Sequence, residues 1–234
     1  MENKKTTIVL VIVIVLIIAL IAVSYFYNDF NMKQKSVLTE ELNKILESNL
    51  LEDDINFDIK AEKNYAKVEK AIKEYVSNIK NIYVEMEEMA SGINPNSIFS
   101  AQNISEKNLD KIDEIIDDYK EKCQNLLAKY EELTDEQKIS EKIENANITI
   151  RKDYYTELYN GIMQSEMMQK QFNKLEEETK NEKARIYDKL NKIEKMKTFL
   201  EEHKDSWAIE NDRIHFTNIN RMVEYYNLFN QVID

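Results

Sequence analysis

The feature that most constrains this chain is an apolar run over residues 8–23, IVLVIVIVLIIALIAV, in which fourteen of sixteen residues are Ile, Leu or Val. Extended to residue 27, the run would form about 30 Å of helix, which matches the hydrocarbon core of a bilayer. At roughly −0.3 to −0.6 kcal/mol per Ile, Leu or Val, its insertion is favoured by about 4 to 8 kcal/mol. The sequence therefore predicts a transmembrane anchor over residues 8–27.

The charges beside this run predict its orientation. Lys4 and Lys5 lie in the N-terminal tail, residues 1–7, and the positive-inside rule places that tail in the cytoplasm. We therefore expect a single-pass protein of the cell membrane with an extracytoplasmic C-terminal domain. A signal peptide cleaved after Ser24 is the alternative, because Ala22 and Ser24 are small. The length of the run and the aromatic residues after it favour an uncleaved signal-anchor.

Composition narrows the fold class of the remaining residues to all-α. The 234 residues include only two Gly and one Pro, whereas a sandwich or barrel needs many turn residues. The formal net charge is −12, and residues 36–137 hold 24 acidic and 12 basic side chains. Such a surface repels phosphate groups, so we expect neither nucleic acid nor anionic lipid as a partner of the extracytoplasmic part.

Two strict heptad seams predict an antiparallel helical bundle or coiled coil. Within predicted helices 58–91 and 105–133, apolar residues recur at alternating intervals of three and four. The seam positions are Ala61, Tyr65, Val68, Ile72, Tyr75, Ile79, Ile82, Met86 and Met89, and then Leu109, Ile112, Ile116, Tyr119, Cys123, Leu126, Tyr130 and Leu133. Modest connections between the helices favour antiparallel neighbours. An amphipathic juxtamembrane helix with a linker, residues 28–55, precedes this bundle, which spans residues 56–206.

Local signals mark the ends of these helices. Gly92 is the expected left-handed C-cap of the first helix, and Asn103 or Ser105 should start the second. Thr134 with Gln137 three residues later matches a capping box.

The region of residues 135–204 contains no proline and admits two interpretations. Apolar ladders cross Gly161, which suits one helix with a stutter. A continuous helix of about 70 residues would, however, extend about 105 Å and outreach its partners. We favour a break at Asn160 and Gly161, which gives helices 135–160 and 162–204.

The last segment, residues 207–234, predicts a β-hairpin followed by a short helix. Residues 207–216, WAIENDRIHF, alternate around Asn211 and Asp212, which suit a two-residue turn. This register makes Glu210 and Arg213 a cross-strand ion pair and places Trp207, Ile209, Ile214 and Phe216 on one face. We expect Thr217 or Asn218 to cap the last helix, whose packing face would carry Ile219, Met222, Val223, Tyr226, Phe229 and Ile233.

No motif of the sequence predicts catalysis, a cofactor or a metal site. Neither His203 nor His215 follows a Glu by three residues, as helical carboxylate metal sites require. Cys123 is the single cysteine and sits in a heptad seam, where we expect a buried, inert thiol. No phosphate loop, nucleophile elbow or paired-cysteine site is present in the sequence.

These observations favour a membrane-anchored scaffold or interaction protein of the cell envelope that is not an enzyme. A protein partner would bind the hairpin and last helix, with Trp207, Glu210, Arg213, His215 and Phe216 as the candidate surface. The alternative is a bundle that senses a small molecule and signals through a partner protein. A parallel homo-oligomer is the third hypothesis, although the tyrosines in both seams favour the bundle.

Overall fold

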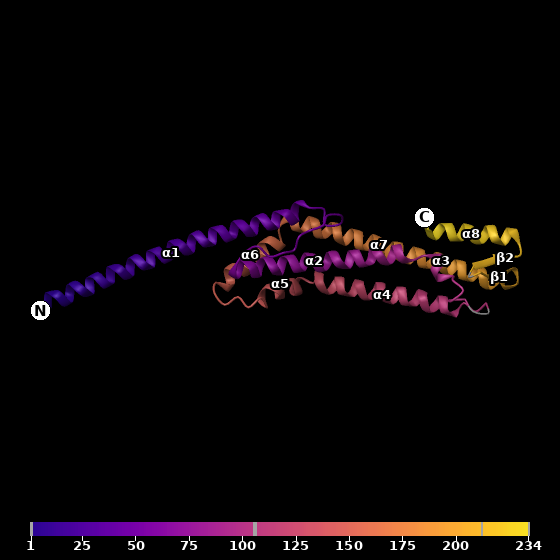
Figure 1. Cartoon of the computed structure of the whole chain (residues 1–234), viewed down its shortest axis with the longest axis horizontal. Helices are drawn as coiled ribbons and strands as arrows, with labels where there is room; N and C mark the ends of the chain where they lie inside the picture. Colours follow the sequence, from indigo (N-terminus) through magenta and orange to yellow (C-terminus); the bar gives the residue numbers. More distant parts are fainter. Residues whose placement is uncertain (1, 105–106, 212, 234) are drawn as a thin grey trace. The chain divides into compact units, whose positions relative to one another are not determined.

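The computed structural model describes the backbone of residues 2–104, 107–211 and 213–233, and their side chains except those of residues 2–18 and 21. The described chain is mostly helical, with a two-stranded hairpin and a final helix at its C-terminal end, as predicted (Figure 1). The elements are α1 (Glu2–Glu47), α2 (Lys63–Gly92), α3 (Pro95–Ile98), α4 (Asp110–Thr134), α5 (Glu136–Glu144), α6 (Lys152–Met163), α7 (Glu166–Glu202), a 3-10 turn (Lys204–Ser206), β1 (Trp207–Glu210), β2 (Arg213–Phe216) and α8 (Ile219–Ile233).

The predicted transmembrane segment falls within α1. In the part of the chain whose side chains are described, no helix is sufficiently long and apolar to cross a membrane. Most side chains of the apolar run, those of residues 8–18 and 21, lie outside that part.

The chain forms two compact units, and α2 contributes to both. The first unit contains Met1–Glu74 and Glu141–Ser165, and the second contains Tyr75–Ser140 and Glu166–Asp234.

In the first unit, the predicted juxtamembrane helix is not a separate element. Residues 28–47 continue α1 without interruption, and only residues 48–62 form a connection to α2. The predicted amphipathic pattern is nevertheless present, because Leu38, Leu42 and Ile45 are buried. The ring of Tyr65 on α2 packs edge-on against Tyr155 of α6, with 5.1 Å between ring centroids.

In the second unit, α4 runs antiparallel to α7. Lys120 pairs with Glu194 at 2.7 Å, and Asp113 pairs with Lys197 at 2.6 Å. The residue numbers therefore increase along α4 in the direction in which they decrease along α7. The C-terminal half of α2 runs parallel to α7, because Tyr75 contacts Phe172 and Ser91 contacts Arg185. Because α7 is antiparallel to α4 and parallel to α2, the two seam helices α2 and α4 run antiparallel, as predicted.

The two predicted heptad seams form much of the core. Every seam residue is buried except Met89, Tyr119 and Leu133, which are half-buried. The second unit adds a third apolar stripe, on α7, that includes Leu175, Ile186, Leu190, Ile193, Met196 and Leu200. Fully burying an aliphatic side chain contributes about 1.5 to 3 kcal/mol, so these stripes are a main source of stability.

Several predicted helix ends were wrong. Gly92 ends α2 without a left-handed conformation, since no described glycine has a positive φ. Asn94 caps the following α3, with its side chain accepting a hydrogen bond from the Asn96 N–H at 2.9 Å. The second seam helix starts at Asp110 instead of near Asn103, and Asn108 accepts the hydrogen bond from the Asp110 N–H. Ser105, the other predicted start, lies outside the described residues.

The predicted capping box at Thr134 was also wrong. Thr134 is the last residue of α4, and its hydroxyl donates to the Tyr130 carbonyl at 3.0 Å. The carboxylate of Asp135 instead accepts hydrogen bonds from the N–H groups of Gln137 and Lys138. Asp135, one residue after the predicted position, therefore caps α5.

The predicted break at Asn160 and Gly161 was wrong as well. Helix α6 continues through Gly161 to Met163, because Tyr155, Tyr159 and Met163 form one buried ladder across the glycine. Glycine costs only about 1 kcal/mol inside a helix, which this packing offsets. The chain breaks instead at residues 164–165 and over residues 145–151, where no helix is formed.

Candidate interaction surface

The C-terminal hairpin forms in the predicted register. Trp207 pairs with Phe216, Ala208 with His215, Ile209 with Ile214, and Glu210 with Arg213. Asn211 adopts a left-handed φ of 50°, as a two-residue turn requires. Asp212, the other predicted turn residue, lies outside the described residues. A hairpin alone is marginally stable, so its contacts with α7 and α8 determine whether it persists.

Trp207 attaches the hairpin to α7. Its side chain is only 1% exposed, and its indole N–H donates to the Leu200 carbonyl at 2.8 Å. The ammonium of Lys107 lies 5.5 Å from the ring centroid and donates to the Lys204 carbonyl. Trp207 is thus a core residue, and a partner cannot contact it without opening the hairpin.

The other candidate residues differ in exposure. Phe216 is half-buried and contacts Tyr225, with 5.2 Å between ring centroids, whereas Glu210, Arg213 and His215 are exposed. The predicted ion pair was wrong: Glu210 and Arg213 are backbone partners, but the structure records no ion pair between these two described side chains. The hairpin therefore presents separate polar groups.

Helix α8 packs with a different face from the one predicted. Its buried residues are Tyr225 and Val232, and burial raises the pKa of the Tyr225 hydroxyl. Tyr225 lies among Phe99, Phe199 and Phe216. Four residues of the predicted packing face are instead exposed: Ile219, Val223, Tyr226 and Ile233. The helix is apolar on two sides, so hydrophobic periodicity alone could not identify the inner one.

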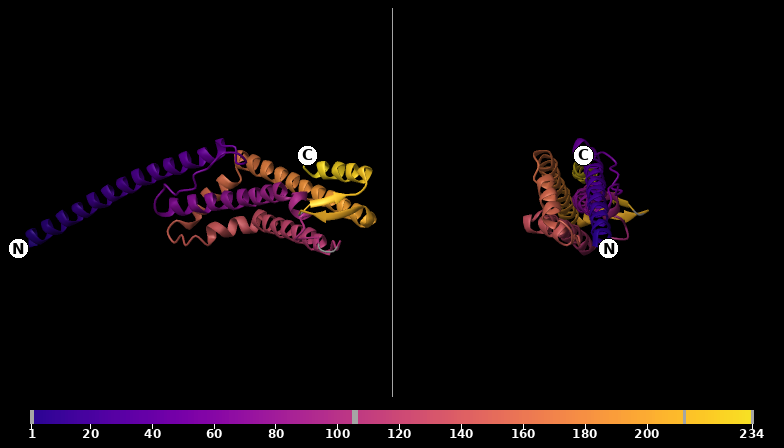
Figure 2. Two further views of the ribbon diagram at one scale, coloured as in Figure 1. Left: turned by 45° about the vertical axis from the view of Figure 1, so that its right-hand side comes forward. Right: turned by 90° about the vertical axis from the view of Figure 1, so that its left-hand side faces the viewer.

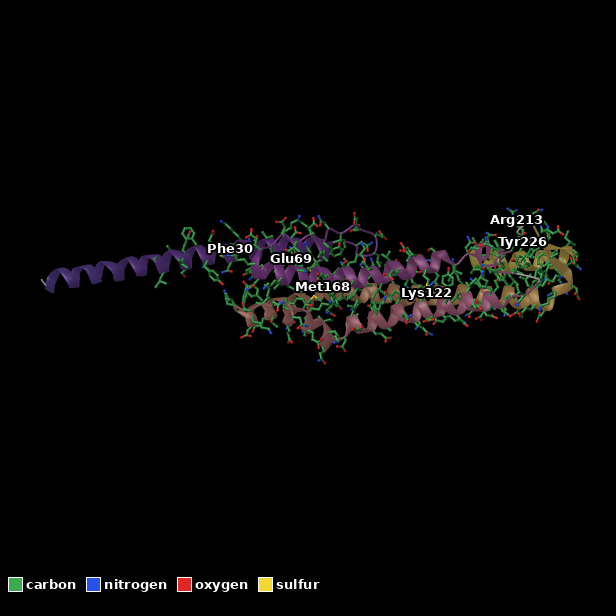
Figure 3. The ribbon with its side chains drawn as sticks, turned by 60° about the horizontal axis from the view of Figure 1, so that its bottom comes forward. Phe30, Glu69, Lys122, Met168, Arg213 and Tyr226 are labelled. Carbon is green, nitrogen blue, oxygen red and sulfur yellow. The ribbon has the colours of Figure 1, made fainter. Side chains whose placement is uncertain are left out.

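Five exposed residues of α8 form a regular seam. Ile219, Val223, Tyr226, Asn230 and Ile233 follow one another at intervals of four, three, four and three. All five are exposed, and Tyr226 is labelled with Arg213 of the hairpin in Figure 3. We call these five residues the α8 seam. Figure 2 shows α8 beside the C-terminal part of α7, with the hairpin next to both.

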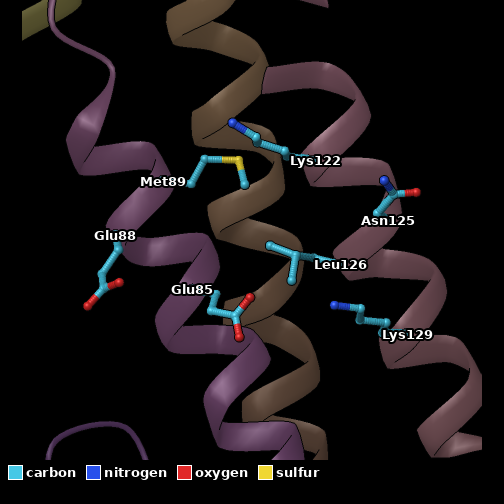
Figure 4. Close-up of a pocket in the computed structure, with 7 residues that line it drawn as sticks. All are labelled: Glu85, Glu88, Met89, Lys122, Asn125, Leu126 and Lys129. Carbon is cyan, nitrogen blue, oxygen red and sulfur yellow. The ribbon is translucent and has the colours of Figure 1, made fainter. Parts of the chain in front are cut away.

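An open groove lies between α2 and α4 of the second unit. Its volume is about 530 Å³, and Leu126 is its only buried lining residue (Figure 4). The charged side chains around it are Glu85, Glu88, Lys122 and Lys129. Lys122 pairs with Asp118 at 2.6 Å, whereas Glu85, Glu88 and Lys129 make no ion pair within the described structure. The groove thus offers charges of both signs to a ligand.

The first unit contains a buried charge cluster that the sequence analysis missed. Lys73 is 1% exposed, and its ammonium lies 2.6 Å from Glu69 and 2.8 Å from Glu41 of α1. It also donates to the Asp58 carbonyl at 2.7 Å. Glu69, labelled in Figure 3, accepts hydrogen bonds from the N–H groups of Lys60 and Ala61. The cluster fastens α1 and the connection 48–62 to α2.

Two neighbouring lysines lower the pKa of Glu41, which lies at the edge of this cluster. Lys44, at 2.6 Å, and Lys73 together hold the pKa of Glu41 below its usual range. The Glu69–Lys73 spacing of four residues was visible in the sequence, but this spacing is usually found on exposed helix surfaces. In the structure, this pair is buried because Glu41 of α1 and the connection that carries the N–H groups of Lys60 and Ala61 cover it.

The structure places the single cysteine in the core of the second unit. Cys123 is buried, and burial raises the pKa of its thiol, which opposes formation of the nucleophilic thiolate. Within the described chain, no group of His, Cys, Asp and Glu side chains could hold a metal ion. His203 stacks on Phe199 and its Nδ1–H donates to the Phe199 carbonyl at 2.8 Å.

Comparison of the chain with protein-family models, curated proteins and solved structures gives no match.

Proposed function

We propose that this chain is a membrane-anchored helical scaffold of the cell envelope whose α8 seam binds an amphipathic helix of a protein partner. It acts by binding and not by catalysis. The observation that carries the proposal is the seam itself, because an exposed apolar stripe of this kind usually marks an interaction site.

The spacing of the α8 seam supports a helix as its occupant. Intervals of four and three match the knobs that insert between residues of a facing helix. Arg221 and Glu224, the two charged residues of α8 (Ile219–Ile233), pair with each other at 2.6 Å, so their charges compensate each other beside the seam. A partner would therefore contribute an apolar, largely uncharged stripe.

The apolar run of α1 supports the membrane anchor. The last turn of the run contains Leu20 and Val23, and Tyr25 and Phe26 follow it. All four side chains are exposed. Apolar side chains on successive turns of one helix need a covering medium, which a bilayer would supply. Lys4 and Lys5 favour a cytoplasmic N-terminus, and the hairpin and α8 would then lie outside the cytoplasm.

Cysteine labelling in intact cells would test this topology. In a Cys123→Ala background, Gln124→Cys introduces an exposed thiol on α4, and Lys5→Cys introduces one before the apolar run. A membrane-impermeant maleimide should label the first in intact cells and the second only after lysis. The reverse pattern, or release of the protein by alkaline carbonate, would contradict the anchor. N-terminal sequencing that begins at Tyr25 would establish the cleaved alternative.

Cross-linking would test the α8 seam. Val223→Glu adds a charge inside the seam, whereas Gln124→Glu adds the same charge at an exposed position of α4. A partner bound through the seam should be cross-linked by the wild type and by Gln124→Glu, and lost from Val223→Glu. Equal capture by all three would overturn the seam assignment. A dimer of the purified protein that Val223→Glu dissociates would show that the occupant is a second copy.

The groove between α2 and α4 supports a second candidate function, the sensing of a small molecule. Its acidic and basic side chains suit a zwitterionic ligand that lies over the apolar side chain of Leu126. A sensor of this kind would signal through a partner protein. A panel of amino acids and related metabolites should then raise the melting temperature of the wild type but not of Lys129→Ala. No ligand-dependent shift would dismiss this candidate.

A further inference from the structure

We propose that residues 145–151, called here the α5–α6 loop, together with the first turn of α2 form a docking surface for anionic phospholipid headgroups. This inference rests on the proposed anchor and adds a second, peripheral contact with the same membrane. All the residues involved belong to the first unit.

The α5–α6 loop lies against α1 directly after the apolar run. The guanidinium of Arg151, the last residue of the loop, neighbours the Tyr27 hydroxyl of α1. The ammonium of Lys63, in the first turn of α2, lies 4.4 Å from the ring centroid of Phe30 on α1. An anchor that ends near residue 27 would therefore bring both cations to the headgroup region.

Hydrogen bonds hold the loop in place on α2. Asn64 donates to the Ile150 carbonyl at 3.2 Å, and Lys67 donates to the Asn147 carbonyl at 2.7 Å. Asn147 and Arg151 both adopt left-handed conformations, with φ of 54° and 55°. These hydrogen bonds give the loop a defined position relative to α2.

The loop carries an exposed apolar side chain, that of Ile150, next to its C-terminal end. Ile150 is 68% exposed, although it is flanked by residues that hold the loop to α1 and α2. An exposed aliphatic side chain beside Arg151 and Lys152 suits the boundary between headgroups and acyl chains, where cations contact phosphate and the apolar group inserts. Arg151 also lies over the ring of Tyr154, at 4.6 Å, which restricts the direction of its guanidinium.

The local charge favours anionic lipid despite the acidity of the whole chain. Residues 25–35, 62–67 and 145–153 contain six Lys or Arg and three Asp or Glu, a net charge of +3, whereas the whole chain carries −12. The sequence-based expectation that the extracytoplasmic part avoids anionic lipid followed from the total charge. It does not apply to this surface, because screening limits each charge to interactions within about 10 Å.

Tryptophan reporters in the full chain, reconstituted into vesicles with brominated lipids, would test the proposal. Ile150→Trp places a reporter in the α5–α6 loop, and Phe26→Trp places one at the end of the anchor. Ile59→Trp is the matched control, because Ile59 is also an exposed isoleucine of the first unit. Ile59 lies far from the end of the anchor. The carbonyl of its neighbour Asp58 accepts a hydrogen bond from Lys73, which also binds Glu41, and Glu41 is about 21 Å beyond Tyr27 along α1. The wild type, with Trp207 alone, supplies the baseline.

We expect bromine to quench Phe26→Trp and Ile150→Trp, and to leave Ile59→Trp at the baseline. Quenching of Phe26→Trp without quenching of Ile150→Trp would overturn the docking surface and leave the anchor intact. Absence of quenching at Phe26→Trp would overturn the anchor and the docking surface together. Equal quenching of Ile150→Trp and Ile59→Trp would also overturn the proposal, since contact with lipid would not be specific to the loop.

A second comparison tests the lipid charge. The quenching of Ile150→Trp should increase when phosphatidylglycerol replaces part of the phosphatidylcholine. Added to that variant, Lys63→Gln or Lys152→Gln should weaken docking about fivefold each in the anionic vesicles. Lys60→Gln, near the control position Ile59, should have no effect. Insensitivity to both lipid charge and these substitutions would overturn the assignment to anionic headgroups.

Discussion

Lys73 and Glu69, one turn apart on α2, form an ion pair of 2.6 Å in which neither side chain is more than 1% exposed. Removal of water from two charges costs several kcal/mol, which the attraction offsets only when further hydrogen bonds complete the site. Here Glu41, the Asp58 carbonyl and two backbone N–H groups supply them. The geometry of the cluster therefore depends on α1, α2 and the connection between them being correctly joined.

Lys73→Ala should destabilise the protein by about 3 to 5 kcal/mol, because it leaves the carboxylate of Glu69 buried without its cation. Lys70→Ala is the matched control on the same helix, since Lys70 and Glu74 pair on the exposed surface, where removal costs about 0 to 1 kcal/mol. Urea unfolding followed by circular dichroism would measure both. Similar losses in the two variants would show that the buried pair contributes no more than a surface pair.

Acid should weaken the same cluster through Glu41. Because Lys44 and Lys73 lower the pKa of Glu41 in the folded state, its contribution is fully present above the usual value of 4.5. That contribution is lost as the pH falls through the lowered pKa, since the unfolded state then binds the proton more readily. Glu41→Gln should flatten the pH dependence of the unfolding free energy below pH 5. An unchanged slope would mean that other carboxylates control acid unfolding.

The sequence predicted the features of this fold that depend on local periodicity. The seams around Ile72, Ile79 and Ile116 were recognisable because each helical turn returns an apolar residue to the same face. The hairpin register was recognisable because a two-residue turn at Asn211 determines every pair. Both signals lie within short stretches of sequence.

Features that depend on distant residues were not predictable in this way. The burial of Lys73 requires Glu41, 32 residues away along the chain. The α5–α6 loop contains neither Gly nor Pro, and its shape depends on donors from Asn64 and Lys67. Helix α8 has two apolar faces, and the face that carries Tyr225 is buried because Tyr225 packs against Phe99 and Phe216. All three features therefore depend on contacts between residues that are far apart in the sequence.

Alkaline pH should destabilise the protein through its buried tyrosines. Burial raises the pKa of Tyr130 to about 12, whereas an unfolded tyrosine titrates near 10. Between these values the unfolded chain releases the proton and the folded chain retains it, so stability falls as the pH rises. Tyr130→Phe should reduce this fall between pH 10 and 12. Thermal unfolding at several pH values would measure the slopes, and equal slopes would contradict a contribution from Tyr130.

The environment of Trp207 gives a spectroscopic prediction. Because the single tryptophan is 1% exposed, its emission should be blue-shifted and poorly quenched by iodide. Trp207→Phe removes the hydrogen bond to the Leu200 carbonyl and leaves that buried acceptor unpaired, which should cost about 1 to 3 kcal/mol. Solvent-like emission from the native protein would indicate that the hairpin does not pack on α7.

The hydroxyl of Thr179 offers a route to a more stable protein. This side chain is buried in α7, and its oxygen has no hydrogen-bond partner in the described structure. A buried hydroxyl without a partner has lost its hydration, so Thr179→Val, which preserves the side-chain shape, should raise the unfolding free energy by about 1 kcal/mol. Thr134→Val is the matched control, because the Thr134 hydroxyl donates to the Tyr130 carbonyl. Urea unfolding should show a gain only for Thr179→Val. A loss at Thr179 similar to that at Thr134 would indicate that the Thr179 hydroxyl is hydrogen-bonded in solution.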